Sequence, residues 1–459
     1  MVEPFDAIVI GTGQAGPSLA ARLVAAGRTV AVVERRDMGG TCVNTGCTPT
    51  KAWVASARAA HVARHAGALG VDVGGSVRVD MQAVKRRKDD LVLQSRHGLG
   101  EWLQGLDGCT VVDGHARFTG AKTVAIDGRT LTAEQVFINT GARPAVPDWP
   151  GLDAVPYLTN ETILELEEVP EHLVVVGGSY VGLEFAQMFR RFGSAVSVVE
   201  RGPDIIRRED PDVVAAIRQL FADEGIDVHT GAECLAVEGR PGAVAVRARM
   251  GDGERRIAGS HLLLAVGRRP NSDDLGLDVA GIATDARGRI EVDDRLETSV
   301  PGVFALGDVN GKGAFTHTSY DDHAIVAANL LDGGDRKVSD RILTYALFID
   351  PPLGRAGLTE AQLRAAGHEA LVATLPMARV GRARERGETA GFMKVLVDAR
   401  TERILGASIF GIEGDEVVHA LLAAMYAGTS YKTLRDAVPI HPTVSELLPT
   451  LLADLGPLD

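Results

Sequence analysis

The feature that most constrains the fold is a motif that occurs twice in the chain. Residues 7–16 read AIVIGTGQAG and residues 174–182 read VVVGGSYVG, each an apolar run that enters a glycine-rich turn. Helix-like sequence follows each turn, at residues 18–26 and 183–192, and a second apolar run then ends in Val-Val-Glu-Arg, at residues 32–35 and 198–201. A buried strand, a tight turn, a helix and a second strand are the parts of a parallel βαβ unit. The repeat therefore predicts two such units.

The turn and the acid in each unit are what a dinucleotide requires. The glycines allow the backbone to approach a pyrophosphate, the helix N-terminus offers free N–H groups, and a carboxylate about 20 residues further on binds ribose hydroxyls. Eighteen positions separate Gly16 from Glu34, and the same number separate Gly182 from Glu200. We predict a first dinucleotide at Gly11, Gly13, Gly16 and Glu34, and a second at Gly177, Gly178, Ser179, Gly182 and Glu200. Ser179 departs from the pattern because it stands where the middle glycine is expected.

Two dinucleotide sites in one chain imply electron transfer between them, most simply from NAD(P)H to FAD. A smaller repeat supports the pairing of the units: residues 137–144 read FINTGARP and residues 264–270 read LAVGRRP. The run VFALGD at 303–308 ends in Gly-Asp, which offers a further carboxylate, Asp308, to a cofactor hydroxyl.

These motifs divide the chain, whose 459 residues are enough for two to four domains. The proline-rich sequence RPAVPDWPG, at 143–151, marks an exit from the first unit. We predict an α/β fold with two Rossmann-like dinucleotide-binding domains and a C-terminal α+β domain. The predicted segments are residues 1–150 (first part of the FAD-binding domain), 151–270 (NAD(P)-binding domain), 271–335 (second part of the FAD-binding domain) and 336–459 (C-terminal interface or dimerisation domain).

Composition excludes several classes of protein. The formal net charge of −13 and the low aromatic content of 5% are unfavourable for nucleic-acid binding, so no nucleic-acid partner is expected. No apolar run approaches the roughly 18 residues of a membrane span, and the acidic N-terminus does not resemble a signal peptide. A cytoplasmic protein without a membrane partner is therefore expected. Four cysteines, at 42, 47, 109 and 234, are too few for a disulfide scaffold.

Two of those cysteines lie close together in GGTCVNTGCTPTK, residues 39–51. A zinc site would need a second pair of ligands nearby, and none follows, so no metal site is predicted. A pair of inert buried thiols is another alternative. A redox disulfide beside the first dinucleotide is favoured, because dithiol–disulfide exchange is a two-electron couple that matches a flavin. A helix N-terminus and Lys51 would favour a thiolate there.

Together the motifs resemble the class I flavoprotein disulfide reductases, a family that includes dihydrolipoyl dehydrogenase, glutathione reductase and mercuric reductase. The resemblance rests on GTGQAG, GGTCxNxGCxPxK, ALGD at 305–308 and HPTVSE at 441–446, and it covers essentially the whole chain. It implies a homodimer whose subunits each have FAD, NAD(P) and interface domains.

The resemblance also implies catalytic roles. Cys42 would attack the substrate, and Cys47 would lie against the flavin as the charge-transfer thiolate. His441 of the other subunit would be the acid–base group, oriented by Glu446, so the active site would be shared across the interface. Histidine suits this role because it titrates near neutral pH.

Further residues are assigned by the same resemblance. Lys51 and Glu184 would pair near flavin N5, and Tyr180 would cover the flavin face where the nicotinamide enters. The remaining predicted cofactor contacts are Gly40, Thr41, Lys51, Ala116, Thr140, Gly141, Asp308 and Thr316 for FAD, and Tyr180 and Gly267 for NAD(P). His317 is expected to touch FAD through its backbone. Neither His61 with His65 nor the basic run 85–88 is assigned a site. The two histidines are interpreted as a solvated or packed helix face, and the basic run is interpreted as a solvated helix face.

The substrate is less constrained. The sequence DPPLGRAGLTE, at 350–360, resembles mercuric-reductase-like proteins, but no cysteine follows Cys234, so the C-terminal cysteine pair of true mercuric reductases is absent. We expect an NAD(P)H-dependent reductase of a small disulfide or a thiol-bound metal, with dihydrolipoyl dehydrogenase as an alternative. A flavin-based redox sensor with little turnover is an alternative of another class. Glu200 favours NADH over NADPH, although Arg201, Arg207 and Arg208 are nearby cations that suit a phosphate.

Overall fold

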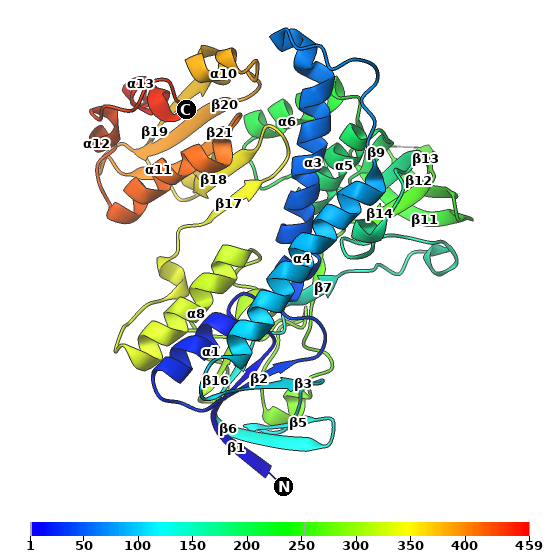
Figure 1. Cartoon of the computed structure of the whole chain (residues 1–459). Helices are drawn as coiled ribbons and strands as arrows, with labels where there is room; N and C mark the ends of the chain where they lie inside the picture. The colour runs from blue at the N-terminus through cyan, green and yellow to red at the C-terminus, as the bar shows by residue number, and fades with distance from the viewer. Residues whose placement is uncertain (1, 252, 459) are drawn as a thin grey trace.

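The computed structural model describes residues 2–251 and 253–458, and its first unit is an α/β layer structure (Figure 1). Within these residues, a seven-stranded sheet has the order β3-β2-β1-β6-β5-β4, and β16 pairs with β6. The strands are β1 (Val2–Ile10), β2 (Val30–Glu34), β3 (Cys109–Asp113), β4 (Arg117–Gly120), β5 (Thr123–Ile126), β6 (Arg129–Ile138) and β16 (Val303–Ala305). Chain from both sides of the second unit thus builds this sheet.

Helices cover the first sheet because its central strands are apolar on both faces. Residues 7–10 of β1 and 30–33 of β2 are all buried, as expected for parallel strands between two helical layers. Helices α1 and α8 lie side by side in Figure 1. The helices of this unit are α1 (Gly16–Ala25), α2 (Gly40–Asn44), α3 (Cys47–His65), α4 (Met81–Gln104), α7 (Leu277–Ala280) and α8 (Thr316–Leu331).

The second unit repeats the same design on a smaller scale. Its parallel sheet has the order β10-β9-β8-β14, and an antiparallel sheet of β11, β12 and β13 packs beside it. The elements are β8 (His172–Val176), α5 (Tyr180–Phe192), β9 (Ala195–Val199), α6 (Pro211–Asp223), β10 (Asp227–His229), β11 (Ala232–Arg240), β12 (Ala243–Met250), β13 (Gly253–Gly259) and β14 (His261–Leu264). The two short repeats found in the sequence pair with each other, as β7 (Ala142–Pro144) and β15 (Arg268–Pro270).

The C-terminal domain, yellow to red in Figure 1, is an antiparallel sheet with helices. Its strand order is β17-β18-β21-β20-β19-β22. The strands are β17 (Thr344–Leu347), β18 (Leu353–Gly357), β19 (Ala370–Pro376), β20 (Phe392–Asp398), β21 (Ile404–Phe410) and β22 (Gly456–Pro457). The helices are α9 (Glu360–Ala365), α10 (Gly381–Glu385), α11 (Gly414–Ala427), α12 (Lys432–Arg435) and α13 (Leu448–Ala453). The α/β fold with a C-terminal α+β domain is as predicted.

A hydrophobic core joins all three parts around helices α3 and α5. Trp53 of α3 packs edge-on against Phe189 and Phe192 of α5, with ring centroids 5.9 and 6.1 Å apart. Leu347 and Leu353 from the C-terminal sheet belong to the same buried cluster. This packing fixes the helix that follows the cysteine motif against the helix that follows the second glycine-rich turn.

One prediction about a helix face is wrong. The basic run Lys85–Lys88 was expected to be solvated, but Lys88 is only 3% exposed. Its ammonium pairs with Asp89 on the same helix and with Glu165, 3.2 Å away in a short 3₁₀ helix. Because Glu165 lies 77 positions further along the chain, nothing near the run indicates this partner.

The short 3₁₀ helices among the described residues are Ala66–Leu69, Leu152–Ala154, Thr162–Glu165, Gly307–Val309, Val338–Asp340, Met377–Arg379 and Ser445–Leu447.

Membrane-spanning segments were not expected from the sequence. Across residues 2–251 and 253–458, no helix has the length and hydropathy that a bilayer crossing requires.

Candidate active site

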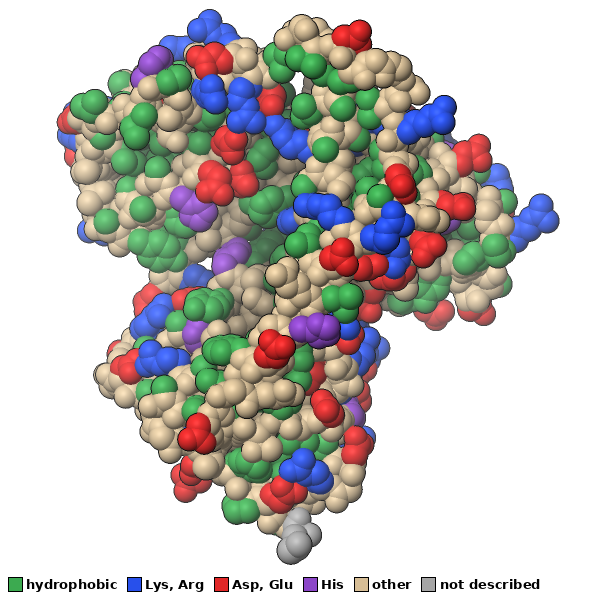
Figure 2. Space-filling model, viewed as in Figure 1, with side chains coloured by type: hydrophobic (Ala, Val, Ile, Leu, Met, Phe, Trp, Pro, Cys, Tyr) green, Lys and Arg blue, Asp and Glu red, His purple; other side chains and the backbone are tan. Residues whose placement is uncertain are grey.

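A cavity of about 1690 Å³ joins the two glycine-rich turns and receives side chains from all three parts of the molecule. Pockets for one small ligand measure about 300–1,000 Å³, so there is room for more than one ligand. Figure 2 shows a hollow between the C-terminal domain and the first unit, with hydrophobic and histidine side chains at its edges. The predicted residues that line the cavity are Gly11, Gly13, Glu34, Gly40, Thr41, Cys42, Cys47, Lys51, Ala116, Thr140, Gly141, Gly177, Gly178, Ser179, Tyr180, Glu184, Glu200, Gly267, Asp308 and Thr316.

The first glycine-rich turn is closed by its own backbone and by one side chain. Gly11 has a φ of +102°, and a Cβ there would lie 2.4 Å from the Asn139 carbonyl oxygen. The amide of Asn139 donates a hydrogen bond to the Gly13 carbonyl at 3.0 Å. A Cβ on Gly16 would lie 2.3 Å from the Gly11 carbonyl oxygen, so Gly16 lets α1 pack on the turn and does not itself line the cavity.

The acid of the first unit is held in place at the end of β2. Glu34 Oε2 accepts hydrogen bonds from the Thr12 amide at 3.0 Å and the Thr12 hydroxyl at 2.6 Å. Glu34 Oε1 accepts from the amides of Arg35 and Arg36. The carboxylate is therefore fixed at the cavity wall, a preorganisation that favours ligand binding.

A second acid, Asp308, faces the cavity from the turn after β16. Burial raises the pKa of the Asp308 carboxyl, and the charge of Arg268 opposes that rise. Arg268 Nε lies 3.6 Å from Asp308 Oδ2 and has no hydrogen-bond partner among the described residues. Another nitrogen of Arg268 donates to the Thr41 hydroxyl at 3.2 Å. Arg268 was not predicted as a site residue, although it belongs to the repeated motif at 264–270.

The second turn has the same construction. Gly177 has a φ of +118°, and a Cβ on Gly182 would lie 1.9 Å from the Gly177 carbonyl oxygen. Like Gly16, Gly182 serves the packing of its helix and does not line the cavity. The Glu200 carboxylate accepts hydrogen bonds from the amides of Gly178 at 2.7 Å and Gly202 at 2.6 Å. Both acids are thus tied to their own turns.

The two cysteines lie at the junction between the turns, and both are free thiols in the structure. Cys47 is the first residue of α3, where a helix N-terminus favours negative charge. The pKa of the Cys47 thiol is lowered to about 6, first by a hydrogen bond with Cys42, then by the Thr316 hydroxyl 3.2 Å away and by the charge of Lys51. The same hydrogen bond, together with burial, raises the pKa of Cys42. The arrangement makes Cys47 the thiolate and Cys42 its donor.

An ion pair lies beside the thiols. Lys51 Nζ is 2.5 Å from Glu184 Oε2, so α3 and α5 are joined across the cavity wall. Phe348, just after β17, contacts both members of the pair. Its backbone amide donates a hydrogen bond to Glu184 Oε1 at 2.9 Å, and its ring centroid lies 4.4 Å from Lys51 Nζ. The predicted pairing of Lys51 with Glu184 is present, and the C-terminal domain supports it through a residue that the sequence did not single out.

His441 and Glu446 form a pair away from the cysteines. His441 Nδ1 lies 2.8 Å from Glu446 Oε2, as expected for an oriented imidazole. Neither residue lines the cavity, and the His441 side chain is 80% exposed. The neighbouring Val438 and Ile440 are 96% and 79% exposed, which is unusual for apolar side chains. The geometry of a single chain therefore does not bring the histidine to the thiols.

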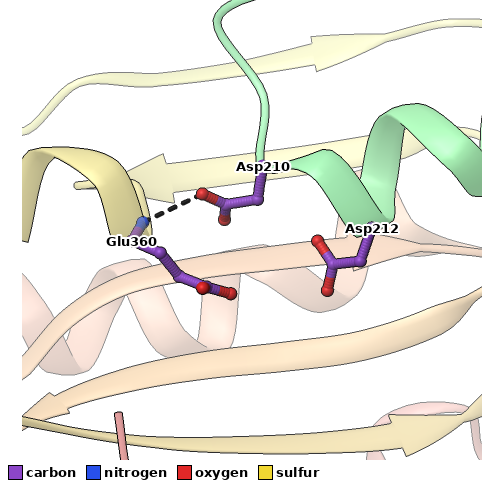
Figure 3. A group of neighbouring side chains, drawn as sticks. All are labelled: Asp210, Asp212 and Glu360. Atoms are coloured by element: carbon purple, nitrogen blue, oxygen red, sulfur yellow. Dashed lines mark hydrogen bonds between the residues drawn. The ribbon is translucent and has the colours of Figure 1, made fainter. Parts of the chain in front are cut away.

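An acidic cluster elsewhere could be mistaken for a metal site. Asp210, Asp212 and Glu360 converge, with the Glu360 amide donating to Asp210 (Figure 3). The buried ammonium of Lys394 lies 2.7 Å from oxygens of Asp212 and Glu360 and 3.0 Å from Asp210. The Lys394 ammonium thus already occupies the position between the carboxylates that a metal ion would take, and the ion pairs tie the second unit to the C-terminal domain.

Two other histidine positions have ordinary surroundings. His61 and His65 stack on each other on α3 with ring centroids 4.2 Å apart, and burial first of all lowers the pKa of His61 to about 4. His61 is half-buried and His65 is exposed on one helix face, which agrees with the predicted solvated or packed face. His317 stacks on Phe315, and its Nε2 lies 2.8 Å from the Thr344 carbonyl oxygen.

Comparison with known proteins places this site in a family. A family model described as pyridine nucleotide-disulphide oxidoreductase matches residues 5–323, and the model of the dimerisation domain of the same oxidoreductases matches residues 343–452. The chain belongs to this family. As a pyridine nucleotide-disulphide oxidoreductase, it is a flavoprotein of a kind that uses FAD and a pyridine nucleotide, and its dimerisation domain supports a homodimer.

Individual relatives cover nearly the whole chain. The probable pyridine nucleotide-disulfide oxidoreductase RclA of Escherichia coli K12 is 36% identical over 98% of this chain and 99% of its own. The mercuric reductase of Streptomyces lividans is 36% identical over 97% and 94%, and the dihydrolipoyl dehydrogenase of Thermus scotoductus is 33% identical over 97% and 96%. The solved Cu(II) complex of RclA, a HOCl-induced flavoprotein disulfide reductase, superimposes with a TM-score of 0.89, covering 97% of this chain and 99% of that one.

The residues of the first site fit FAD. Gly40 packs so closely on the first turn that a Cβ there would lie 2.8 Å from Gly13 Cα. The absence of a side chain at Gly40 leaves the backbone of this turn accessible to a pyrophosphate. Arg268 Nε is buried without a hydrogen-bond partner among the described residues and faces the half-buried Asp308. A cofactor with a pyrophosphate and ribityl hydroxyls supplies the acceptors and donors that such groups require.

Glu34 offers a direct test of this placement. Glu34→Ala is expected to weaken FAD binding about ten- to a hundredfold, because a hydrogen bond to a charged group contributes about 1.5–3 kcal/mol. Flavin absorbance per mole of protein after gel filtration measures the loss. Glu200→Ala, the same exchange at the second turn, is the matched control and should keep its FAD. Wild-type flavin content in Glu34→Ala would contradict the assignment.

Proposed function

We propose that the protein is an FAD-dependent reductase that passes electrons from NADH, in preference to NADPH, to the Cys42–Cys47 pair and on to a small disulfide or a thiol-bound metal ion. The observation that carries the proposal is the position of the two thiols. They lie between the two dinucleotide turns, next to the Lys51–Glu184 pair, in one cavity. Cys47 has a lowered thiol pKa there, as a redox-active pair requires.

The first site would hold FAD through its turn, Glu34 and Asp308, with Thr41, Ala116, Thr140, Gly141 and Thr316 along the cavity wall. When bound, FAD supplies two-electron chemistry that links a nicotinamide to a dithiol. Lys51 and Glu184 keep a fixed charge pair beside Cys47, and Thr316 donates to the thiolate. These residues hold the thiolate ready without further rearrangement.

The exchange itself follows from the two thiols. The Cys42 thiolate attacks one sulfur of the substrate disulfide, which breaks that bond, forms a mixed disulfide and releases the first substrate thiolate. The Cys47 thiolate then attacks the Cys42 sulfur and releases the second. Two electrons pass from the dithiol to the substrate, leaving a Cys42–Cys47 disulfide and, after proton transfer, two substrate thiols.

Proton transfer to and from Cys42 needs an acid–base group. The pKa of Cys42 is raised, so Cys42 must lose its proton to a base before it attacks. We assign this role to His441 of the partner subunit, which would later return the proton to the leaving thiolate. Glu446 would hold the imidazole in the required tautomer through the 2.8 Å contact with Nδ1.

The other two cysteines do not extend the redox path. Burial raises the pKa of Cys109, and it raises the pKa of Cys234 to about 11, so neither is a reactive thiolate near neutral pH. The substrate must therefore reach the inner pair directly. A compact disulfide meets this requirement, and so does a thiol-bound metal ion such as Cu(II), the ion bound in the similar RclA structure.

A panel of oxidants under NADH tests the function. The purified holoenzyme is assayed with lipoamide, glutathione disulfide, other small disulfides, Hg(II) and Cu(II), two Cu(II) ions being needed to accept the electrons of one dithiol. Turnover that is lost in Cys42→Ser supports the reductase, and preference for lipoamide would favour a dihydrolipoyl dehydrogenase. A yellow protein that NADH bleaches but that no oxidant restores would contradict a reductase and favour a redox sensor.

We propose NADH as the preferred coenzyme because the Glu200 carboxylate is anchored where the ribose hydroxyls of the second dinucleotide would lie. Arg207 packs against Gly202 and, with Arg201 and Arg208, also lines the cavity, so cations are close. Glu200→Ala is expected to reduce the NADH preference by about fivefold or more, because like charges about 4 Å apart repel by ~1 kcal/mol even in water.

The ratio of kcat/KM for NADH and NADPH measures this effect. Glu34→Ala reconstituted with excess FAD is the matched control and should keep the wild-type ratio. A wild-type enzyme that clearly favours NADPH would mean that the arginines determine the preference.

We also propose that the chain divides into four functional segments, residues 1–150, 151–270, 271–335 and 336–459. We further propose that the enzyme acts in the cytoplasm, where the thiol pool is reducing.

A further inference from the structure

Three aromatic rings from three parts of the chain meet at the junction of the two dinucleotide sites. Tyr180 begins α5, Phe315 precedes α8, and Tyr345 lies on β17. The Tyr180 ring meets Phe315 and Tyr345 edge-on, with both centroid distances 5.5 Å, and Phe315 stacks on Tyr345 at 5.4 Å. All three line the cavity. The three rings form a closed cluster, here called the aromatic triad.

Tyr345 is the anchored member of the aromatic triad. It is 5% exposed, and its hydroxyl donates a hydrogen bond to Glu209 Oε1. Glu209 is buried beside Arg355, whose Nη1 lies 3.6 Å from Glu209 Oε2 and 3.3 Å from Asp210 Oδ2. Arg355 itself is fully buried on β18. A buried, charge-assisted network of this kind holds a side chain in one orientation.

Tyr180 is a half-buried member of the aromatic triad. It lies one helical turn before Glu184, so it shares a helix face with the acid that pairs with Lys51. The ring therefore lies where the second dinucleotide site opens toward the thiols and the first site. A nicotinamide that reaches this junction needs the space that the Tyr180 ring fills.

We propose that Tyr345 is a positioning residue that latches Tyr180 in its closed place, so that nicotinamide entry requires breaking the contacts of Tyr180 with Tyr345 and Phe315. The proposal rests on the proposed function, since it assumes that the nicotinamide occupies this junction. Glu209 gives the latch its rigidity by fixing the Tyr345 hydroxyl. The latch weakens nicotinamide binding because only the fraction of enzyme molecules in which Tyr180 has left its closed position can bind the nicotinamide.

The size of the effect follows from the ring contacts. An edge-on aromatic pair contributes enough to change an equilibrium constant about two- to twelvefold. Tyr345→Leu removes one such contact from the closed state and nothing from the open state. The variant should bind the nicotinamide end of the coenzyme about two- to twelvefold more tightly than wild type. A purely structural role for Tyr345 would give weaker binding or no change.

Binding without turnover tests this prediction. Oxidised holoenzyme is titrated by calorimetry with tetrahydro-NAD, whose saturated nicotinamide ring cannot act as a reductant. Tyr345→Leu should lower the Kd of tetrahydro-NAD about two- to twelvefold. Tyr345→Phe keeps the ring but loses the hydrogen bond to Glu209, so it should lower the Kd by a smaller factor. ADP-ribose, which lacks the nicotinamide, should bind all three proteins equally. Tyr431→Leu, a half-buried tyrosine of the same domain outside the cavity, should match wild type.

A double variant isolates the coupling. In a Tyr180→Leu background the latch is already open, so adding Tyr345→Leu should leave the Kd of tetrahydro-NAD unchanged. The proposal is overturned if both Tyr345 variants bind tetrahydro-NAD as wild type does or more weakly, or if ADP-ribose binding tightens equally. Failure of the wild-type enzyme to bind tetrahydro-NAD at all would contradict the proposed function itself.

Discussion

In the Cys47→Ser variant, reduction of disulfides by NADH is expected to fall below detection. Loss of a reacting nucleophile lowers kcat by a factor on the order of 10⁶ where this has been dissected. A serine hydroxyl at the start of α3 can accept the hydrogen bond from Cys42, but it cannot close a disulfide. Steady-state NADH oxidation with the best oxidant from the panel measures the loss. Cys109→Ser changes a free thiol that does not line the cavity; it is the matched control and should keep wild-type turnover.

The absorption spectrum separates the roles of the two cysteines. Cys42→Ser should show a long-wavelength charge-transfer band without added reductant, because Cys47 is then a free thiolate beside the flavin. Cys47→Ser should lack the band. If the two variants behave in the opposite way, the roles of the cysteines are exchanged.

The pH dependence of that band tests the cause of the lowered pKa. A thiolate persists above its pKa, so the band of the reduced wild type should be lost as the pH falls through about 6. The hydrogen bond with Cys42 is the largest cause of the lowering. Cys42→Ala removes that donor, whereas Cys42→Ser keeps a hydroxyl. The midpoint in Cys42→Ala should therefore rise toward the ordinary thiol pKa of 9.0, above the midpoint in Cys42→Ser.

Local sequence determined much of this molecule in advance. The two glycine-rich turns were predictable because a positive φ at Gly11 and Gly177 and the close packing of Gly16 and Gly182 each require glycine at a fixed spacing. The acids at the ends of the second strands followed from the same spacing. Helix α5 begins at Tyr180, three residues before the predicted start, because the extended backbone ends at Ser179.

Long-range partners could not be predicted. Lys88 is buried because Glu165 meets it from a distant segment, and nothing within the run itself shows this. Arg268 and Asn139 act on cofactor-facing groups from inside motifs that were noticed only as repeats. Tyr345 illustrates the same limit: its role depends on Glu209, 136 positions away, and on rings from two other elements.

His441→Ala is expected to slow dithiol–disulfide exchange about 10²–10⁴-fold, the usual contribution of a positioned acid–base group. Cys42 has a raised pKa, so it depends on an external base more than an ordinary thiol would. Reduction of the flavin by NADH should be nearly unchanged, because the nicotinamide side of the cavity contains neither His441 nor Glu446. Stopped-flow measurement of the two half-reactions separates them. Equal slowing of both would place His441 in a structural role.

Mixed dimers decide whether the histidine acts across the interface. His441 is 80% exposed in one chain and does not line the cavity that holds the thiols. Our proposal therefore assigns the acid–base role to His441 of the partner subunit. The His441→Ala homodimer should have about 1% of wild-type exchange activity or less, and the Cys47→Ser homodimer should have none. In a mixed dimer the intact cysteines of one subunit face the intact histidine of the other, which restores one of the two sites. Random reassociation should then recover roughly a quarter of wild-type activity, since half of the dimers are mixed. If the histidine served its own subunit, no pairing of these variants would restore activity.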